Sequence, residues 1–198
     1  MKHRMLLDIP TYIETQRLYL RPYQAGDGPW YYAMSQRNRP HLARYEAENA
    51  AMSLDSEQNA EILVREFAAD WIARKHFFLG AFDKTTDEFV AQIYVGSADW
   101  DLPEFAIGYF ADKDHEGQGF VTEAVQAMLP FLFTHLGAHR LRLHCSDTND
   151  RSRRVAERCG FALEGHIREN ELNPDGTFGG TLYFGLLRSE YEALRRDG

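Results

Sequence analysis

The chain has 198 residues, of which 44% are hydrophobic and 26% are charged; this composition is typical of a globular protein and excludes a disordered one. Its net charge of -8 argues against a general nucleic-acid binder and fits a cationic substrate such as an amine. No window approaches a membrane span or a signal peptide. Two cysteines, Cys145 and Cys159, make neither a disulfide framework nor a metal site, so we expect a reduced, cytoplasmic protein that does not bind membranes.

The first half of the chain predicts a strand, two helices and a hairpin. Alternation or helical spacing of apolar residues defines each of these elements. In chain order we expect a strand over 12–22, a helix over 27–37, a longer helix from Ser53 or Asp55 to Ala73, and strands over 76–82 and 89–95 around a turn at 83–87.

The second half predicts a strand, helix, strand order that continues to the carboxyl end. We expect strands over 104–110, 140–146, 162–168 and 181–187, helices over 121–136 and 150–159, and a turn at 173–176. Pro130 should kink or break the first of these helices. The whole pattern predicts a mixed α/β sheet, in which the strands on either side of Val121 are parallel and joined by a right-handed crossover.

The stretch HEGQGFVTEA, His115–Ala124, places two glycines directly before a predicted helix. Gly117 and Gly119 can adopt positive φ and expose several N–H groups at a helix N-terminus, where the dipole favours an anion such as a pyrophosphate. A flexible surface turn is the alternative for a lone Gly-x-Gly. The P-loop lysine is absent, and Thr122 stands where a dinucleotide fingerprint needs its third glycine, so both nucleotide motifs are poor matches.

Four segments in register resemble the GNAT N-acetyltransferases, and more narrowly the branch named for the ribosomal-protein acetylases RimJ and RimL. HEGQGFVTEA is similar to the family's acyl-CoA loop, residues 13–22 to its opening strand, 107–109 to its central strand, and 149–165 to its Asn-x-x-Ser helix and next strand. Because the resemblance covers about residues 12–192, it implies one domain over 1–198 with the GNAT fold, a central splayed mixed sheet flanked by helices. Glu116 and Val121 depart from the family, which usually has Gln or Arg and then Ala or Gly there.

The resemblance implies acetyl transfer from acetyl-CoA, the cosubstrate, to a primary amine. The thioester would lie in a splay between the strand through Tyr109 and the next parallel strand. Backbone N–H groups near Phe110 and Ala111, at a bulge, would serve it, whereas the side chains of Tyr109 and Phe110 are expected to be core aromatics. The residues expected to bind the cosubstrate are Tyr109, Phe110, Ala111, Gly117, Gln118, Gly119, Phe120, Val121, Thr122 and Asn149.

Ser152 and Glu171 are the catalytic candidates that the resemblance implies. Ser152 would donate to the leaving thiolate, and Asn149, three residues earlier, would bind the pantetheine arm or simply cap the helix. Glu171, just beyond the strand that ends near Arg168, would accept the amine proton, or else is a solvated loop acid.

Three further residues are weaker candidates for a role in catalysis. Glu104 and His144 are alternatives to Glu171 as the base, although His144 is expected to be a strand residue packed against a helix. Nothing marks Cys145 as an activated nucleophile, so direct transfer is expected.

The sequence leaves several candidates for the amine that accepts the acetyl group. A protein N-terminus is one candidate, and a small amine such as a polyamine, an amino sugar or an aminoglycoside is another. A CoA-binding sensor without catalysis is a third reading, for which Glu116 and Val121 are the support. The acidic run around Glu46 and Glu48 is expected to be solvated. A homodimer is expected from the family alone.

Overall fold

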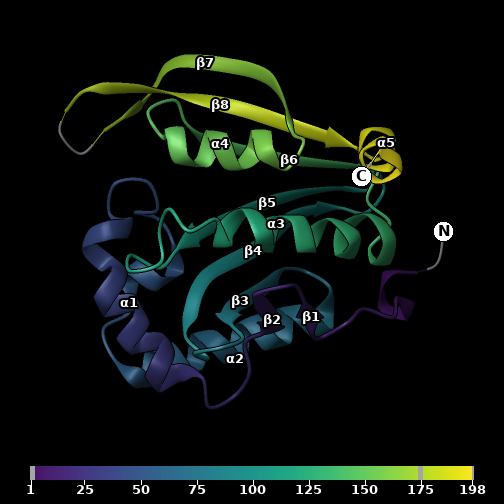
Figure 1. Cartoon of the computed structure of the whole chain (residues 1–198). Helices are drawn as coiled ribbons and strands as arrows, with labels where there is room; N and C mark the ends of the chain where they lie inside the picture. The colour runs from purple at the N-terminus through teal and green to yellow at the C-terminus, as the bar shows by residue number, and fades with distance from the viewer. Residues whose placement is uncertain (1–2, 174–175, 198) are drawn as a thin grey trace.

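The computed structural model describes residues 3–173 and 176–197. Their strands form one eight-stranded sheet in the order β1-β2-β3-β4-β5-β6-β8-β7 (Figure 1). The strands are β1 Ile13–Glu14, β2 Leu18–Pro22, β3 Phe77–Asp83, β4 Phe89–Asp99, β5 Glu104–Ala111, β6 Arg140–Ser146, β7 Ala162–Leu172 and β8 Phe178–Leu187. The helices are α1 Gly28–Leu42, α2 Glu57–Ala73, α3 Phe120–Pro130, α4 Asp150–Arg158 and α5 Arg188–Asp197, with shorter turns at Arg4–Leu6, Ala50–Ser53 and Phe131–His135. The predicted mixed sheet is confirmed.

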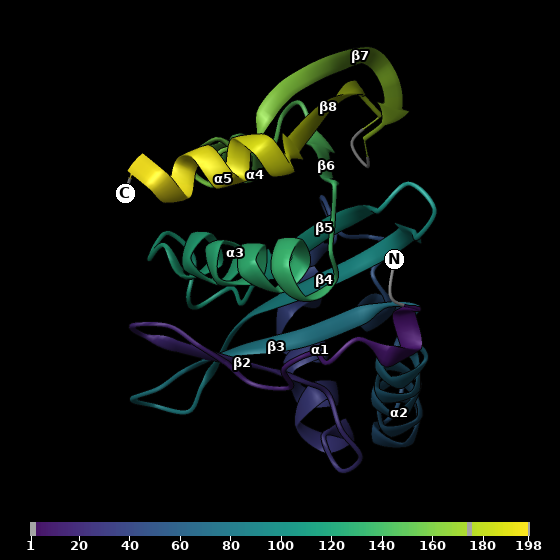
Figure 2. The ribbon, with the colours of Figure 1, turned by 90° about the vertical axis from the view of Figure 1, so that its right-hand side faces the viewer.

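One pair of neighbouring strands, β5 and β6, runs parallel, and helix α3 connects them as predicted. The pairing covers Glu104↔Arg140, Phe105↔Leu141 and Ala106↔Arg142. Strand β5 continues to Ala111 and β6 to Ser146, but beyond the third pair the two strands separate. The sheet therefore splits into two halves, strands β1 to β5 and strands β6, β8 and β7, which diverge in Figure 2.

Helices cover both faces of the first half of the sheet. Helix α3 packs on one face, where Leu79, Ile93 and Phe105 belong to the main core. Helices α1 and α2 cover the opposite face, where Phe82 and Phe110 belong to a second core. Alternation along each strand sends successive side chains to these two cores, which is the reason the apolar runs in this half are nearly continuous.

The structure differs from the predicted boundaries where side-chain hydrogen bonds or tertiary packing intervene. The predicted first strand is two strands, because the Thr15 hydroxyl accepts a hydrogen bond from the Leu18 N–H (2.8 Å) and closes a turn between them. Helix α1 runs on to Leu42 through Pro40, five residues past its predicted end at residue 37. Helix α5 was not predicted at all. Strand β7 extends to Leu172, so Glu171 lies within a strand rather than beyond one.

Pro130 ends the α-helical part of the segment predicted as one helix. Phe131–His135 follows as a π-helix, in which the Leu136 N–H donates to the Phe131 carbonyl oxygen (3.0 Å). The expected break is confirmed, and its form is a change of helical hydrogen bonding, since proline has no N–H to donate.

Leu141→Ala should lower the free energy of unfolding by about 2–5 kcal/mol, because truncating this fully buried β6 side chain leaves a cavity in the main core. Leu163→Ala is the matched control. This β7 leucine is 57% exposed, and the same truncation should change the free energy by less than about 0.5 kcal/mol. Urea unfolding measures both, and equal losses would contradict the core described above.

Candidate active site

The glycine-rich turn delivers bare backbone amides to the start of α3, as the sequence predicts. Gly117 has φ 72° and Gly119 has φ 80°, conformations that side chains with a Cβ rarely adopt. Gly119 is the N-cap of α3 and makes no side-chain cap hydrogen bond. The first intrahelical bond runs from the Glu123 N–H to the Gly119 carbonyl oxygen (3.0 Å), so the three preceding N–H groups, of Phe120, Val121 and Thr122, have no acceptor within the helix. Such a terminus can bind an anion.

The carboxylates of this turn form ion pairs with arginine side chains. Their negative charges are therefore balanced and repel an anionic ligand less. Glu116 forms an ion pair with Arg151 of α4 and lies 3.5 Å from the ring of His41 at the end of α1. Glu123 pairs with Arg17 (2.6 Å). The Arg17 guanidinium also lies 4.4 Å from the Phe120 ring centroid and donates to the Gln118 carbonyl oxygen (3.0 Å). The turn is thus fixed from both sides.

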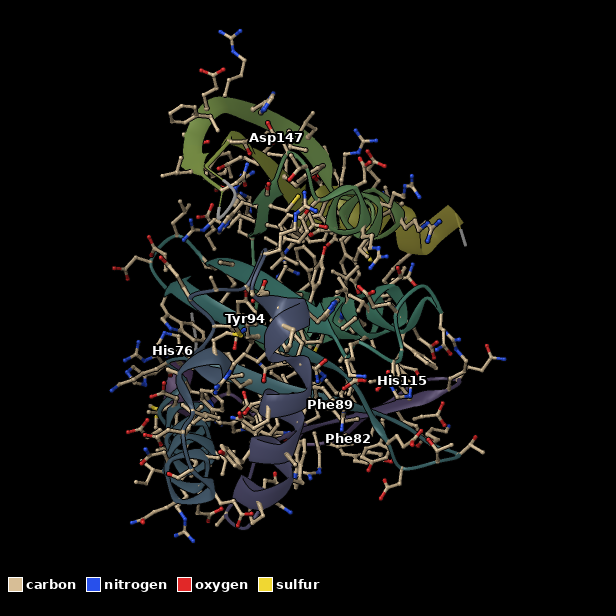
Figure 3. The ribbon with its side chains drawn as sticks, turned by 90° about the vertical axis from the view of Figure 1, so that its left-hand side faces the viewer. His76, Phe82, Phe89, Tyr94, His115 and Asp147 are labelled. Carbon is tan, nitrogen blue, oxygen red and sulfur yellow. The ribbon has the colours of Figure 1, made fainter. Side chains whose placement is uncertain are left out.

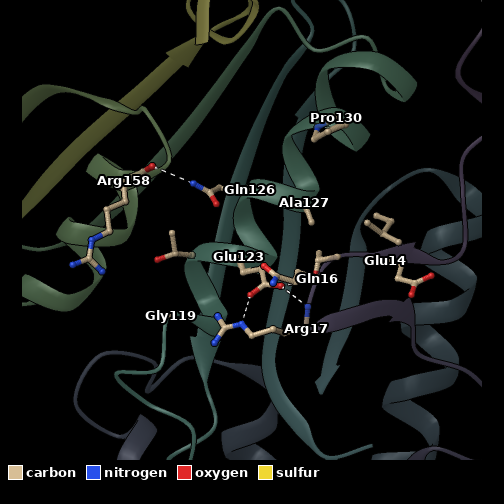
Figure 4. A pocket seen from close by; sticks show the side chains of 12 residues that line it. Glu14, Gln16, Arg17, Gly119, Glu123, Gln126, Ala127, Pro130 and Arg158 are labelled. Atoms are coloured by element: carbon tan, nitrogen blue, oxygen red, sulfur yellow. Dashed lines mark hydrogen bonds and ion pairs between the residues drawn. The ribbon is translucent and has the colours of Figure 1, made fainter. Parts of the chain in front are cut away.

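A groove of about 650 Å³ runs along the outer side of α3 from this turn (Figure 4). Its lining comes from α3, from the β1–β2 turn and from Arg158 at the end of α4. Gln126 of α3 donates to the Arg158 carbonyl oxygen (3.4 Å) across it. Gly119 and Thr122 lie at its amide-bearing end, so a ligand bound to the helix start could extend into the groove.

Where β5 and β6 separate, backbone groups of β5 face a gap. The Asp112 N–H donates to Val90 of β4 (2.9 Å), and alternation along the strand aims the N–H of Phe110 at β4 as well. The N–H groups of Tyr109 and Ala111 therefore point toward β6. The expected bulge at this end is wrong: β4 and β5 pair without a shift from Ala106 to Ala111, and the irregularity lies between Gly96 and Asp99.

Three polar side chains meet across the gap. The Tyr109 hydroxyl lies 3.0 Å from Ser152 Oγ and donates to the Ser152 carbonyl oxygen (3.1 Å), so Tyr109 is more than the core aromatic that was expected. Cys145 of β6 lies close enough to Ser152 for the serine to lower the pKa of the cysteine thiol. Burial raises the pKa of Tyr109, which keeps its hydroxyl protonated and able to donate. Phe110, in contrast, is a buried core residue beside Phe89, as predicted.

Asn149 caps helix α4. Its Oδ1 accepts a hydrogen bond from the Ser152 N–H (3.1 Å), which confirms the capping role that the sequence left open. The cap fixes the first turn of α4 and with it the side chain of Ser152. Burial is the largest effect on Cys145 and raises the pKa of its thiol against the opposing effects of Ser152 and Arg153, so the thiol is not activated as a nucleophile.

The three carboxylate and imidazole candidates for the base lie in different places. Glu171 is exposed on β7 and accepts a hydrogen bond from the Thr181 hydroxyl (2.7 Å). Glu104 pairs with Arg140 (2.8 Å) at the far end of β5, so the structure does not bring it to the gap. His144 is exposed and stacks on Tyr183 of β8, with ring centroids 5.9 Å apart, rather than packing against a helix.

The sequence analysis missed a loop that closes the α1 side of the gap. This connection, residues 43–49, follows α1, and its Tyr45 hydroxyl donates to the Thr148 carbonyl oxygen beyond β6 (3.1 Å). Burial raises the pKa of the adjacent Glu46 to about 7, against an opposing hydrogen bond from Asn49. The prediction of a solvated acidic run is therefore wrong for Glu46 and correct for the exposed Glu48. No sequence signal separated the two, because loop packing decides which carboxylate is buried.

Residues 17–162 match the model of the acetyltransferase (GNAT) domain. The chain is a GNAT N-acetyltransferase. It is 27% identical over 163 residues to the probable N-acetyltransferase YjcK of Bacillus subtilis, a match that spans 80% of this chain and 87% of that one. It is 33% identical over 84 residues to the ribosomal-protein-serine acetyltransferase of Escherichia coli, 42% of this chain and 47% of that enzyme.

Among solved structures, the ribosomal L7/L12 alpha-N-protein acetyltransferase RimL in complex with coenzyme A has a fold similar to that of this GNAT enzyme. It superposes with a TM-score of 0.78 at 19% identity and covers 90% of this chain and 97% of its own. The fold inferred from the four motifs, and the RimJ/RimL-like character of the relatives, are confirmed. In the described part of the acetyltransferase, every helix is too short or too polar to cross a membrane, and no three potential metal ligands cluster.

Gly119→Ala should lower the free energy of unfolding by about 1–2 kcal/mol, since alanine must adopt the left-handed conformation at this N-cap. Gly165→Ala is the control, because Gly165 is not among the glycines with positive φ and a Cβ there would meet open space. Chemical denaturation of both variants is the measurement. A loss at Gly165 as large as that at Gly119 would contradict the strained turn.

Proposed function

We propose that the protein transfers the acetyl group of acetyl-CoA directly to the α-amine of a protein N-terminus. The observation that carries the proposal is that two kinds of hydrogen-bond donor, backbone amides and side-chain hydroxyls, lie together where the sheet splits. Free helix-terminal amides lie on one side of the split, and unpaired strand amides and a Tyr109–Ser152 hydroxyl pair line the gap. The ribosomal-protein acetyltransferases among the relatives support the choice of a protein N-terminus.

The residues present fit coenzyme A. The amides from Gly117 to Thr122 would hold its diphosphate, the N–H groups of Tyr109 and Ala111 its pantetheine amides or the oxyanion, and Asn149 the pantetheine arm. The individual residues assigned to this site are Gly117, Gln118, Gly119, Phe120, Val121, Thr122, Tyr109, Phe110, Ala111 and Asn149. The contact with Phe110 stays a prediction from the family resemblance, since its N–H is directed at β4.

The chemistry assigned to the site balances with two proton transfers. The ammonium form of the acceptor loses one proton to a base, its nitrogen then attacks the thioester carbonyl, and the C–N bond forms as the carbonyl electrons move to oxygen. When the tetrahedral intermediate collapses, the C–S bond breaks and the nitrogen gives up a second proton. We assign to Ser152 the donation to the departing thiolate, and its hydrogen bond with Tyr109 in the gap supports this assignment. Glu171, the base predicted from the sequence, remains a prediction.

Ser152→Ala should lower kcat by about 10²-fold or more and leave the dissociation constant for acetyl-CoA unchanged, because the hydroxyl acts on the leaving group and not on the diphosphate. Stopped assays of thiol release and calorimetric titration with acetyl-CoA separate the two effects. Ser146→Ala, on β6 near the gap, is a control for loss of a nearby hydroxyl. Wild-type turnover in Ser152→Ala would remove Ser152 from the mechanism.

A panel of acceptors tests the function itself. Thiol release from acetyl-CoA should be fastest with peptides that carry a free N-terminal serine or alanine, and N-terminally blocked copies of the same peptides should be inert. Faster release with spermidine or an aminoglycoside would assign a small-amine acetyltransferase instead. Binding of acetyl-CoA without thiol release for any acceptor would assign a non-catalytic sensor.

A further inference from the structure

The loop after α1 holds a carboxylate against the sheet on the side opposite α3. The Glu46 N–H donates to the Leu42 carbonyl oxygen (2.8 Å), and Asn49 Nδ2 donates to Glu46 Oε2 (2.9 Å). One residue earlier, Tyr45 is anchored to Thr148 across the gap. Backbone and side chain of Glu46 are thus both fixed, unlike the neighbouring exposed Glu48.

Tyr94 connects this carboxylate to the split of the sheet. Tyr94 lies on β4 and faces the second core, where its ring stacks on Phe78 with centroids 6.0 Å apart. Its ring occupies the space above Gly108 of β5, where any Cβ would overlap it. Figure 3 shows Tyr94 on the α1 side of the sheet and Asp147 on the other half, beyond the gap.

The charge of Glu46 also affects the ionisation of Tyr94. Burial raises the pKa of Tyr94, and the negative charge of Glu46 raises it further, so the carboxylate lies within interaction range of the Tyr94 hydroxyl. Tyr94 in turn contributes to the raised pKa of Tyr109, whose main cause is burial. The Glu46 carboxylate and the Tyr94 hydroxyl thus interact on the α1 side of the sheet, and Tyr109 and Ser152 form the hydroxyl pair in the gap.

We propose that Glu46 receives the proton that leaves the ammonium group of the acceptor. This inference rests on the proposed function and identifies the base of that reaction. In this proposal the acceptor approaches from the α1 side, where Glu46 and Tyr94 lie, whereas the α3 side presents the amides assigned to the cosubstrate. Glu171 lies on the other half of the sheet, exposed and hydrogen-bonded to Thr181.

The step transfers one proton and neutralises one positive and one negative charge. The carboxylate of Glu46 takes a proton from R–NH₃⁺ and becomes neutral, and the nitrogen keeps the electron pair that attacks the thioester. Between turnovers the proton passes from Glu46 to water. A half-buried carboxyl suits this task because its neutral form is tolerated in a partly desolvated site.

The pH dependence follows from the groups around Glu46. From the sheet it is faced by Tyr94, and within its own loop it is flanked by Tyr45 and Arg44. His41, Glu116 and Arg151 form the next charged cluster beyond Tyr45. With the pKa of Glu46 at about 7, kcat/KM for the wild type should rise with pH up to that value, because the base must be ionised.

Glu46→Gln should lower kcat/KM by about 10²-fold or more for a peptide with a free N-terminal serine, and should abolish the limb of the pH profile near 7. Glu46→Asp should restore part of the rate together with that limb. Glu48→Gln, which removes an exposed carboxylate two residues away, should behave as wild type. Calorimetry with acetyl-CoA should give the same dissociation constant for all four proteins.

A stability measurement provides a second readout that does not depend on turnover. The folded-state pKa of Glu46 lies above the ordinary glutamate pKa of 4.5, so its contribution to stability is fully present below that pH and is lost as pH rises through about 7. Glu46→Gln removes this loss. Its Tm should therefore exceed that of wild type at pH 8 and converge with it near pH 4.

The outcomes distinguish the two proposals. Loss of peptide acetylation in Glu46→Gln, with partial rescue in Glu46→Asp, supports the assignment. An active wild type whose Glu46→Gln variant keeps its rate and pH profile overturns the role of Glu46 and leaves the proposed function standing. A wild type that acetylates no acceptor of the panel overturns both.

Discussion

The separation of β5 from β6 is the constraint on which the rest of the site depends. Two parallel strands pair at three positions and then diverge, although each continues for several residues. Strand β6 keeps its partner β8 on the opposite edge along its whole length, from Arg140↔Leu187 to Ser146↔Thr181, so the backbone groups left without a strand lie on the facing edges of β5 and β6. Backbone donors need partners. An extended ligand with amide groups can supply them by taking the place of a strand in the gap, as the proposed function requires.

The elements around the gap are fixed by contacts that join distant parts of the sequence. Arg17 of the β1–β2 turn holds Glu123 and Gln118 at the start of α3, and Arg151 of α4 holds Glu116 on the same loop. Tyr45 reaches Thr148, and Tyr109 reaches Ser152. Each contact is modest alone, and several are solvent-exposed. Together they place the glycine turn, the capped α4 and the loop after α1 around one opening, with separate approaches from the α3 and α1 sides of the sheet.

The charge distribution differs between these two sides. On the α3 side, carboxylates are paired with arginines, which leaves the backbone amides free to attract an anion. On the α1 side, Glu46 accepts a hydrogen bond from Asn49, and burial raises its pKa to about 7, which suits the role proposed for it. The two proposals thus place the cosubstrate and the proton acceptor on opposite sides of one sheet.

Local sequence determined the elements and the chemistry of the turn: alternation set Leu141, Leu143 and Cys145 inward on β6, and Gly117 and Gly119 marked a backbone that needs positive φ. Those features depend on neighbours in the chain, and they were predictable for that reason. Only the tertiary structure decided that Tyr109 meets Ser152, that Glu171 lies within an exposed strand, and that Glu46 is half-buried while Glu48 is exposed. A carboxylate's environment is set by groups far along the chain, here Tyr94, 48 positions later, and no local pattern encodes such a meeting.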